Sequence, residues 1–244
     1  MSRLQEPESG LEGSRPALVR LPGCYPVQAD TWLLADTMTE LGCAVGARVL
    51  DLCTGTGALA VAAALAGATD VTAVDLSYRS SANAWINARR HGVPVTVLRG
   101  DLFAALDEVG QFDLILANPP YVPSFTSRPS RHRVDRCWDA GPDGRLLLDR
   151  ICREAYAHVA PGGSLLIVQS DVADVDATTR CLVQYGFGVE VVRREPEAFG
   201  PVMRARAAAM RRRGLVAEGQ ELEELAVVRA VRPTVGTVGL EATA

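Results

Sequence analysis

Short apolar runs alternate regularly with segments of helical spacing along most of this chain. Such β-branched runs are typical of buried strands, and apolar residues spaced three and four apart are typical of helices. The alternation predicts a single α/β domain: a doubly wound, mostly parallel, seven-stranded sheet with helices on both faces. The expected strands are 48–52, 70–75, 94–98, 112–117, 163–170, 188–193 and 225–231, and the expected helices are 28–41, 58–66, 80–91, 145–158 and 172–185.

Two stretches fall outside this pattern. Residues 1–20 mix Ser, Glu, Gly and Pro without periodicity, which predicts a flexible N-terminal tail. Residues 21–244 then form the domain, and the arginine-rich stretch at about 196–220 is expected to be a helical insertion between the last two strands. The longest apolar stretch, 58–68, is far too short to cross a bilayer, and the N-terminus has no signal pattern. We therefore expect a cytoplasmic protein without a membrane segment.

The composition argues against two kinds of site. The six cysteines are scattered without a C-x-x-C pair, which predicts buried thiols and no metal ion. The net charge is -4 although all 25 basic residues are arginine. Proteins dedicated to nucleic-acid binding usually carry a basic surplus, so this charge argues against that class.

The tetrapeptide Asn118-Pro119-Pro120-Tyr121 directly follows the predicted strand 112–117. Neither proline has an N–H, so the chain must leave the sheet at Asn118 in a stiff turn. The turn offers the Asn118 side-chain oxygen and the Pro119 carbonyl as acceptors, beside the aromatic face of Tyr121. Two fixed acceptors beside a ring suit a planar NH2 group, such as a carboxamide or the exocyclic amine of a base. The motif therefore indicates a nitrogen-directed transferase.

A glycine turn joins the first predicted strand to the helix that follows it. Gly55-x-Gly57-x-x-Ala60 with an acid at Asp75 resembles a dinucleotide fingerprint, and the same glycines also suit a plain tight turn. Asp51 argues against a dinucleotide, because a carboxylate facing the helix N-terminus repels phosphate and attracts a cation. S-adenosylmethionine carries a sulfonium and an ammonium group but no phosphate, so it fits Asp51.

Two further acids end neighbouring strands where an adenosine needs them. Asp75 ends the second strand and is placed to accept from both ribose hydroxyls. Asp101 follows the third strand and is placed to accept from the adenine amine, with Leu102 against the ring. Each acid alone is equally well explained as a helix cap or turn residue. Their combination with the glycine turn and Asn118 favours a cofactor site.

In this order the motifs resemble the class I S-adenosylmethionine-dependent methyltransferases, and among them the HemK-type family that methylates the glutamine amide of peptide-chain release factors. The resemblance covers about 25–192, and Tyr25 with Asp30-Thr31-Trp32 is similar to the family's short cofactor-covering motif. Residues 138–150 are similar to the segment after the active-site loop in its short, eukaryotic and archaeal-like branch. With the turn residues included, the predicted cofactor site is Thr31, Asp51, Cys53, Gly55, Gly57, Asp75, Leu76, Asp101, Leu102 and Asn118, and the predicted catalytic residues are Asn118, Pro119, Pro120 and Tyr121.

The chain departs from the family pattern in three places. Too few residues precede Arg48 to build the helical substrate-recognition domain of the long bacterial branch. Cys53 stands where the family usually has glycine, and its side chain either narrows the methionine pocket or simply packs. The insertion is longer than the short branch leads us to expect. That branch often works with a small partner subunit, and the sequence leaves such a subunit and self-association open.

The leading hypothesis is methylation of a glutamine side-chain amide in a protein such as a release factor. No general base is assigned, and His132 is interpreted as an exposed loop residue. The alternative is methylation of an exocyclic amine of DNA or RNA, where a flipped base would stack on Tyr121, or of a small metabolite. A third hypothesis is a cofactor-binding subunit without catalysis, whose role would survive Asn118→Ala.

Two arginine clusters bear on the nucleic-acid alternative. They would hold phosphates if nucleic acid were the substrate, but a solvated protein face explains them slightly better. A steep salt dependence of binding would favour the phosphate interpretation. The clusters are Arg128, Arg131, Arg133 and Arg136 after the turn, and Arg204, Arg206, Arg211, Arg212 and Arg213 in the insertion.

Overall fold

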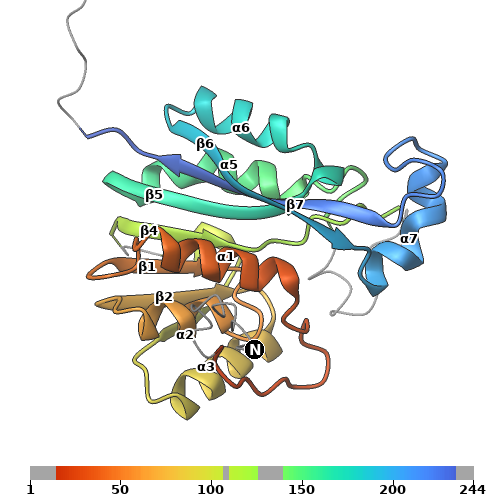
Figure 1. The fold of residues 1–244 in the computed structure, drawn as a ribbon. Helices are drawn as coiled ribbons and strands as arrows, with labels where there is room; N and C mark the ends of the chain where they lie inside the picture. Colours follow the sequence, from red (N-terminus) through yellow and green to blue (C-terminus); the bar gives the residue numbers. More distant parts are fainter. Residues whose placement is uncertain (1–14, 107–109, 126–139, 235–244) are drawn as a thin grey trace, which may run out of the picture.

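A seven-stranded sheet with helices on both faces forms the body of the protein (Figure 1). The computed structural model describes residues 15–106, 110–125 and 140–234. The strands are β1 (Arg48–Leu52), β2 (Asp70–Asp75), β3 (Thr96–Arg99), β4 (Phe112–Ala117), β5 (Val159–Ser170), β6 (Gly188–Ala198) and β7 (Leu222–Val231). Their order is β3-β2-β1-β4-β5-β7-β6, and β7 is antiparallel to both neighbours while all other pairs are parallel. The predicted doubly wound, mostly parallel sheet is confirmed.

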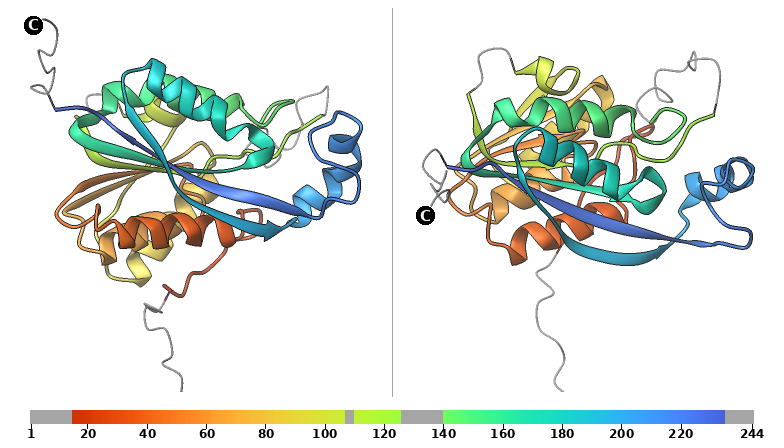
Figure 2. Two further views of the ribbon diagram at one scale, coloured as in Figure 1. Left: turned by 45° about the horizontal axis from the view of Figure 1, so that its top comes forward. Right: turned by 90° about the horizontal axis from the view of Figure 1, so that it is seen from above.

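The helices form one layer on each face of the sheet (Figure 2). One layer contains α1 (Ala29–Glu40), α2 (Ala58–Leu65) and α3 (Tyr78–Arg90), and the other contains α5 (Leu146–His158) and α6 (Val175–Gln184). Two short 3-10 turns, η1 (Leu102–Ala105) and η2 (Asp171–Ala173), follow β3 and β5. Among the residues that the structure describes, no helix is long and apolar enough to span a membrane.

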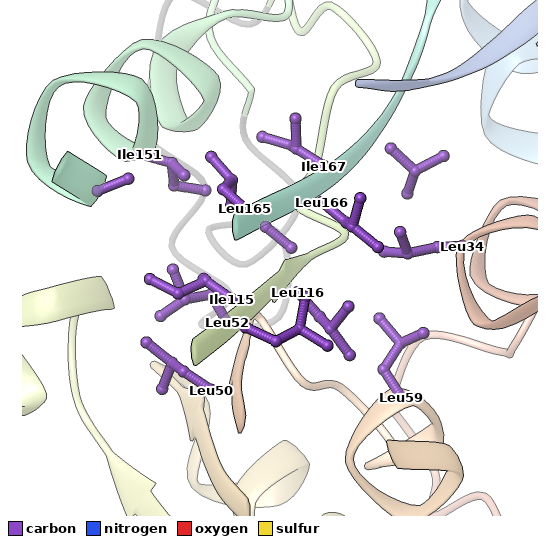
Figure 3. Packing of buried hydrophobic residues seen from close by; sticks show 14 of the residues in the cluster. Leu34, Leu50, Leu52, Leu59, Ile115, Leu116, Ile151, Leu165, Leu166 and Ile167 are labelled. Atoms are coloured by element: carbon purple, nitrogen blue, oxygen red, sulfur yellow. The ribbon is translucent and has the colours of Figure 1, made fainter. Parts of the chain in front are cut away.

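Leucine and isoleucine side chains from β1, β4 and β5 fill the space between the sheet and both helix layers (Figure 3). In the parallel register Leu50 lies beside Ile115, and Asp51 lies beside Leu116. Successive side chains point to opposite faces, so the buried carboxylate Asp51 stands on the α2 face among leucines. Each fully buried Leu or Ile contributes roughly 1.5–3 kcal/mol, which fixes the register firmly. The carboxyl ends of β1, β2 and β4 therefore meet at one edge.

The last two strands are longer than the sequence pattern predicts. β6 was expected to end at Arg193 but continues through Pro196, which pairs with Glu224 of β7. Proline is tolerated there because β6 is the edge strand. A register shift between Val191 and Arg193 interrupts the alternation of side chains, so the sequence pattern does not predict the rest of the strand. Within the predicted insertion the helix is α7 (Pro201–Arg211), which sits at the tip of the β6–β7 hairpin (Figure 1).

The N-terminal segment is held in place over the part that the structure describes. Residues 1–14 of the predicted tail lie outside the described residues. Val19 donates its N–H to Asn87 Oδ1 at 2.9 Å, and its carbonyl accepts from both Asn83 and Asn87. Leu21 donates to Asn83 Oδ1 at 2.8 Å. The prediction of a flexible tail is therefore wrong for 15–20, because two buried amides on α3 satisfy its backbone as a neighbouring strand would.

Most other boundaries agree with the prediction within one to three residues. β5 begins four residues earlier than expected, at Val159. The helix expected from Val172 begins at Val175, because Asp174 caps it by accepting the N–H of Ala177.

Gly144 packs directly under the Asn-Pro-Pro-Tyr turn. It has a left-handed backbone with φ +81°, and a Cβ placed on it would lie 2.2 Å from the Tyr121 carbonyl oxygen. Gly214 has a similar φ of +71°, but nothing lies within 4 Å of a Cβ built there. Both substitutions to alanine therefore strain the backbone equally, and only the one at Gly144 also displaces the turn.

We expect Gly144→Ala to be less stable than Gly214→Ala, because only its new methyl group collides with another part of the backbone. The extra loss in the free energy of unfolding should be about 1–3 kcal/mol. Urea unfolding of the two variants measures it. Equal midpoints for both would show that Gly144 does not support the turn.

Candidate functional site

A cavity of about 390 Å³ opens at the carboxyl ends of the parallel strands β1 to β4. Its volume is in the range of pockets that hold small ligands and cofactors, and its position is where ligands bind in such sheets. All but two of the predicted site residues line this cavity. The lining ones are Thr31, Cys53, Gly55, Asp75, Leu76, Asp101, Leu102, Asn118, Pro119, Pro120 and Tyr121.

Asp51 lies behind the glycine turn rather than on the cavity surface. Its Oδ2 accepts from the Thr54 hydroxyl and, at 3.0 Å, from the N–H of Ala60 at the start of α2. Among the described residues its Oδ1 has no hydrogen-bond partner. Complete burial, with a smaller contribution from Asp75, raises the pKa of Asp51 to about 7. A buried carboxylate with one oxygen left over favours a positively charged neighbour.

Gly57 also lies outside the cavity lining, and its lack of a side chain leaves room for a neighbouring helix. A Cβ on Gly57 would lie 2.8 Å from the Cα of Ala84 on α3. The glycine therefore allows α2 and α3 to approach closely. Gly55, by contrast, lines the cavity and donates its N–H to Asp75 Oδ2 at 2.9 Å.

Asp75 ties the end of β2 to the glycine turn and also lines the cavity. Its Oδ1 accepts from the N–H of Ser77 at 2.8 Å, while Oδ2 accepts from Gly55. Burial raises the pKa of Asp75 above its ordinary value, although these hydrogen bonds oppose the rise. Each carboxylate oxygen can accept a second bond, so the side chain is able to hold a pair of neighbouring hydroxyls.

Cys53 and Leu102 both line the cavity with left-handed backbones, at φ 60° and φ 50°. This region disfavours residues with a Cβ by about 1–2 kcal/mol, so a glycine would be the usual choice at position 53. The left-handed backbone at Cys53 is the conformation that glycine adopts easily, and the family that the sequence resembles usually has glycine at this position. Backbone strain of this kind is typical of ligand-binding turns.

Asp101 is half exposed at the rim, where Arg150 of α5 donates to its Oδ1 at 2.9 Å. Arg150 also lines the cavity. This arginine was not among the predicted site residues, because the spacing within a helix does not say which strand end the side chain reaches. The ion pair leaves the other Asp101 oxygen as an acceptor.

Asn118 is held by the start of α1. Its Nδ2 donates to Thr31 Oγ1 at 3.1 Å. Burial raises the pKa of the nearby Asp30 carboxyl above its ordinary value, although hydrogen bonds, one of them from Asn118, oppose the rise. Because the amide nitrogen is used inside the protein, the side-chain oxygen is the remaining polar atom of Asn118. This residue lines the cavity, so its oxygen remains the candidate acceptor there.

Tyr121 is more buried than its predicted role of an aromatic platform requires. Only 7 % of the residue is exposed, and its hydroxyl donates to Asp30 Oδ2 at 3.1 Å. Burial and the nearby Asp30 carboxylate hold the pKa of the phenol well above its usual value. The ring therefore contributes to the wall of the site and leaves little face for a stacked base.

Helix α7 contacts the segment after the tetrapeptide. Arg206 donates to the carbonyls of Val122 and Pro123 at 2.8 and 3.0 Å. The guanidinium carbon of Arg213 lies 4.0 Å from the centroid of the Phe125 ring. Val202 lines the main cavity. The hairpin tip is thus part of the site's wall, a role that its arginine-rich sequence did not reveal.

These contacts bear on the predicted arginine clusters. Within α7 and the residues after it, Arg206 and Arg211 donate to backbone carbonyls, and Arg213 lies over the Phe125 ring. Arg204, Arg212 and Arg213 are exposed. The other cluster, together with His132, lies outside the described residues.

A smaller cavity of about 50 Å³ lies behind Asp30 and Tyr121 and is lined by Glu223. Glu223 is 6 % exposed, and its Oε2 has no hydrogen-bond partner among the described residues. Burial raises the pKa of Glu223 to about 7, and the negative charge of Asp30 adds to the rise, although a hydrogen bond with Ser170 opposes it.

Comparison with known proteins identifies relatives of this chain. Residues 24–130 match the family model described as methyltransferase small domain. A provisionally named protein N5-glutamine methyltransferase of Methanocaldococcus jannaschii is 31% identical over 182 residues, which are 75% of this chain and 90% of that protein. The release factor glutamine methyltransferase of Deinococcus radiodurans is 41% identical over 148 residues, which are 58% of this chain and 52% of that protein. The chain thus spans about half the length of this bacterial relative.

Solved structures share the fold. One is the E. cuniculi Mtq2–Trm112 complex, described as responsible for methylation of the eRF1 translation termination factor. It has a TM-score of 0.57 and 22% identity, covering 86% of this chain and 99% of that chain. At this identity the likeness concerns the fold.

We expect Glu223→Gln to stabilise the protein at about pH 8 by about 1–3 kcal/mol and to change little at about pH 4.5. The native state holds the Glu223 proton up to about pH 7, whereas an ordinary glutamate loses it near 4.5, so stability falls as pH rises through this range. Thermal unfolding at both pH values measures the effect. The half-exposed neighbour in Glu224→Gln serves as the control. A Glu223→Gln gain of equal size at both pH values would contradict the assignment.

Proposed function

The chain belongs to the S-adenosylmethionine-dependent protein N5-glutamine methyltransferase family, and on this premise we propose that it methylates the side-chain amide nitrogen of a glutamine in a protein. The observation that carries the proposal is the fixed amide of Asn118. Its nitrogen donates to Thr31, which leaves its oxygen as an acceptor, and both Asn118 and Pro119 line the cavity. Two acceptors match the two N–H groups of a carboxamide.

The chemistry of the donor set fits the cofactor. Acidic side chains, rather than groups that would bind a phosphate, surround the glycine turn. Behind it lies Asp51 Oδ1, which has no hydrogen-bond partner in the described part of the chain. We assign Asp75 to the ribose hydroxyls, and Asp101 with Leu102 to the adenine. The turn at Gly55 takes the methionine end, beside Cys53 and Leu76. When bound, S-adenosylmethionine supplies an electrophilic methyl group on a sulfonium sulfur.

The protein's own task is to make a poor nucleophile attack. An amide nitrogen shares its lone pair with the carbonyl, so it reacts only when it becomes pyramidal. Hydrogen bonds from its two N–H groups to Asn118 Oδ1 and the Pro119 carbonyl orient the nitrogen and favour that change. Holding the reactants in near-attack geometry supplies several kcal/mol, of a ceiling near ~7–11 kcal/mol. The nitrogen then loses one proton to water, and no side chain is assigned as the base.

The acceptor is proposed to be a protein of the translation machinery. The D. radiodurans relative is named a release factor glutamine methyltransferase. A relative in Bradyrhizobium diazoefficiens is named a ribosomal protein uL3 glutamine methyltransferase. The E. cuniculi neighbour was solved with Trm112, so a small partner subunit is the first addition to make if the chain alone is inactive.

The nucleic-acid alternative has less support from the site. A flipped base needs an open aromatic face, and Tyr121 is nearly covered. Two of the arginines around α7, Arg206 and Arg211, already donate to backbone carbonyls, and Arg213 lies over the Phe125 ring. Methylation of a base or of a small metabolite is therefore kept as an outcome of the test.

We expect radiolabelled S-adenosylmethionine to label a release factor, and total RNA and DNA not to be labelled. Asn118→Ala should lower the rate by about 100-fold or more, because one of the two acceptors is lost. An exposed change on α6, Arg180→Ala, is the control and should keep the rate. Label on nucleic acid instead would contradict the proposal, and mass spectrometry of the labelled peptide locates the methyl group.

A further inference from the structure

One buried carboxylate connects the start of α1 to both ends of the tetrapeptide. Asp30 is the second residue of α1 and is only 3 % exposed. Its Oδ1 accepts from the backbone N–H of Thr31 at 2.7 Å and from the Thr31 hydroxyl at 3.2 Å. Its Oδ2 accepts from the Tyr121 hydroxyl at 3.1 Å. The helix N-terminus around Asp30 favours a negative charge there.

The directions of these bonds determine which way the Asn118 amide faces. The Thr31 hydroxyl has a single proton, and it donates that proton to Asp30 Oδ1. The Thr31 oxygen then offers Asn118 lone pairs and nothing else. Asn118 must present its NH2 group to Thr31, at 3.1 Å, and cannot present its oxygen. The hydrogen bond from Thr31 to Asp30 thus sets the orientation of the Asn118 amide.

The second arm of Asp30 fixes the other end of the same turn. Tyr121 is buried and donates to Oδ2, so the ring cannot swing away without leaving a buried carboxylate oxygen unpaired. An unpaired buried polar atom costs about 1–3 kcal/mol. Pro119 and Pro120 lie between the two anchored residues and are stiff. Anchoring both ends therefore also sets the direction of the Pro119 carbonyl.

We infer that Asp30 is a positioning residue which, through Thr31 and Tyr121, turns the Asn118 side-chain oxygen and the Pro119 carbonyl toward the acceptor NH2 group. The inference rests on the proposed function, because it concerns the same acceptor. It also gives Thr31 a different role from the cofactor contact that the resemblance implies. Asp30 itself is not assigned to touch the substrate.

Kinetics of the threonine variants test the inference on an intact fold. Thr31→Val keeps the shape of the side chain but removes the hydroxyl, whereas Thr31→Ser keeps the hydroxyl. With a glutamine peptide as acceptor, Thr31→Val should lower kcat by about tenfold or more while KM for S-adenosylmethionine stays within about twofold. Thr31→Ser should recover most of the rate. A Thr31→Val enzyme that keeps its kcat would overturn the inference, as would one that loses only cofactor affinity.

Asp30 is tested with a matched pair of variants. Asp30→Asn keeps an oxygen acceptor for Thr31 and nearly the same shape, whereas Asp30→Ala removes every acceptor. We expect Asp30→Ala to lose about as much kcat as Thr31→Val, and Asp30→Asn to recover part of it. Thermal unfolding of both variants separates a folding defect from a positioning defect. Equal rates for Asp30→Asn and Asp30→Ala at equal stability would count against the inference.

A spectroscopic readout keeps this test separate from the proposed function. The chain has three asparagines, Asn83, Asn87 and Asn118, so selective ¹⁵N labelling gives three side-chain NH2 signals. Thr31→Val should shift the Asn118 signal and speed its exchange with solvent, while the signals of Asn83 and Asn87 on α3 stay in place. An unchanged Asn118 signal would overturn the inference even if a glutamine peptide is labelled. A changed signal with no labelled peptide would instead reject the proposed function.

Discussion

The parallel register of β1 with β2 and β4 is the constraint on which the rest of the structure depends. It pairs Asp51 with Ala73 and with Leu116, so three strands reach the same edge of the sheet at the same level. Buried leucines and isoleucines hold that register, because a slip by one residue would turn them to the wrong face. The glycine turn, Asp75 and the Asn-Pro-Pro-Tyr turn follow directly from those strand ends. A cavity with acids at one end and an oriented amide at the other is the consequence.

Much of this arrangement was predictable from the sequence, because it depends on local signals. Apolar runs and their spacing indicate the strands, and parallel strands in a doubly wound sheet bring their carboxyl ends together. Two prolines without N–H groups force the chain out of the sheet after Asn118. The acids at strand ends, such as Asp75, then point to a ligand that is positively charged and carries hydroxyls. Comparison with relatives supports the same family.

The rest depends on contacts between distant parts of the chain. Asp30 stands 91 residues from Tyr121, and no local pattern says that the two meet. Arg150 reaches Asp101 from a helix whose orientation only packing decides. A register shift interrupts the alternation of the edge strand before Pro196, so the pattern does not predict its end. The composition of 15–20 predicts a tail, but buried amides on α3 bind Val19. In each case tertiary packing overrode the local signal.

A structure with S-adenosylhomocysteine and a glutamine peptide tests the central claim most directly, because that claim concerns where one nitrogen lies. The account predicts the glutamine amide nitrogen within about 3 Å of both Asn118 Oδ1 and the Pro119 carbonyl oxygen. It also predicts that Asn118 Nδ2 still donates to Thr31. A complex in which Asn118 presents its nitrogen to the glutamine carbonyl, with Thr31 turned to the cofactor, would contradict the account.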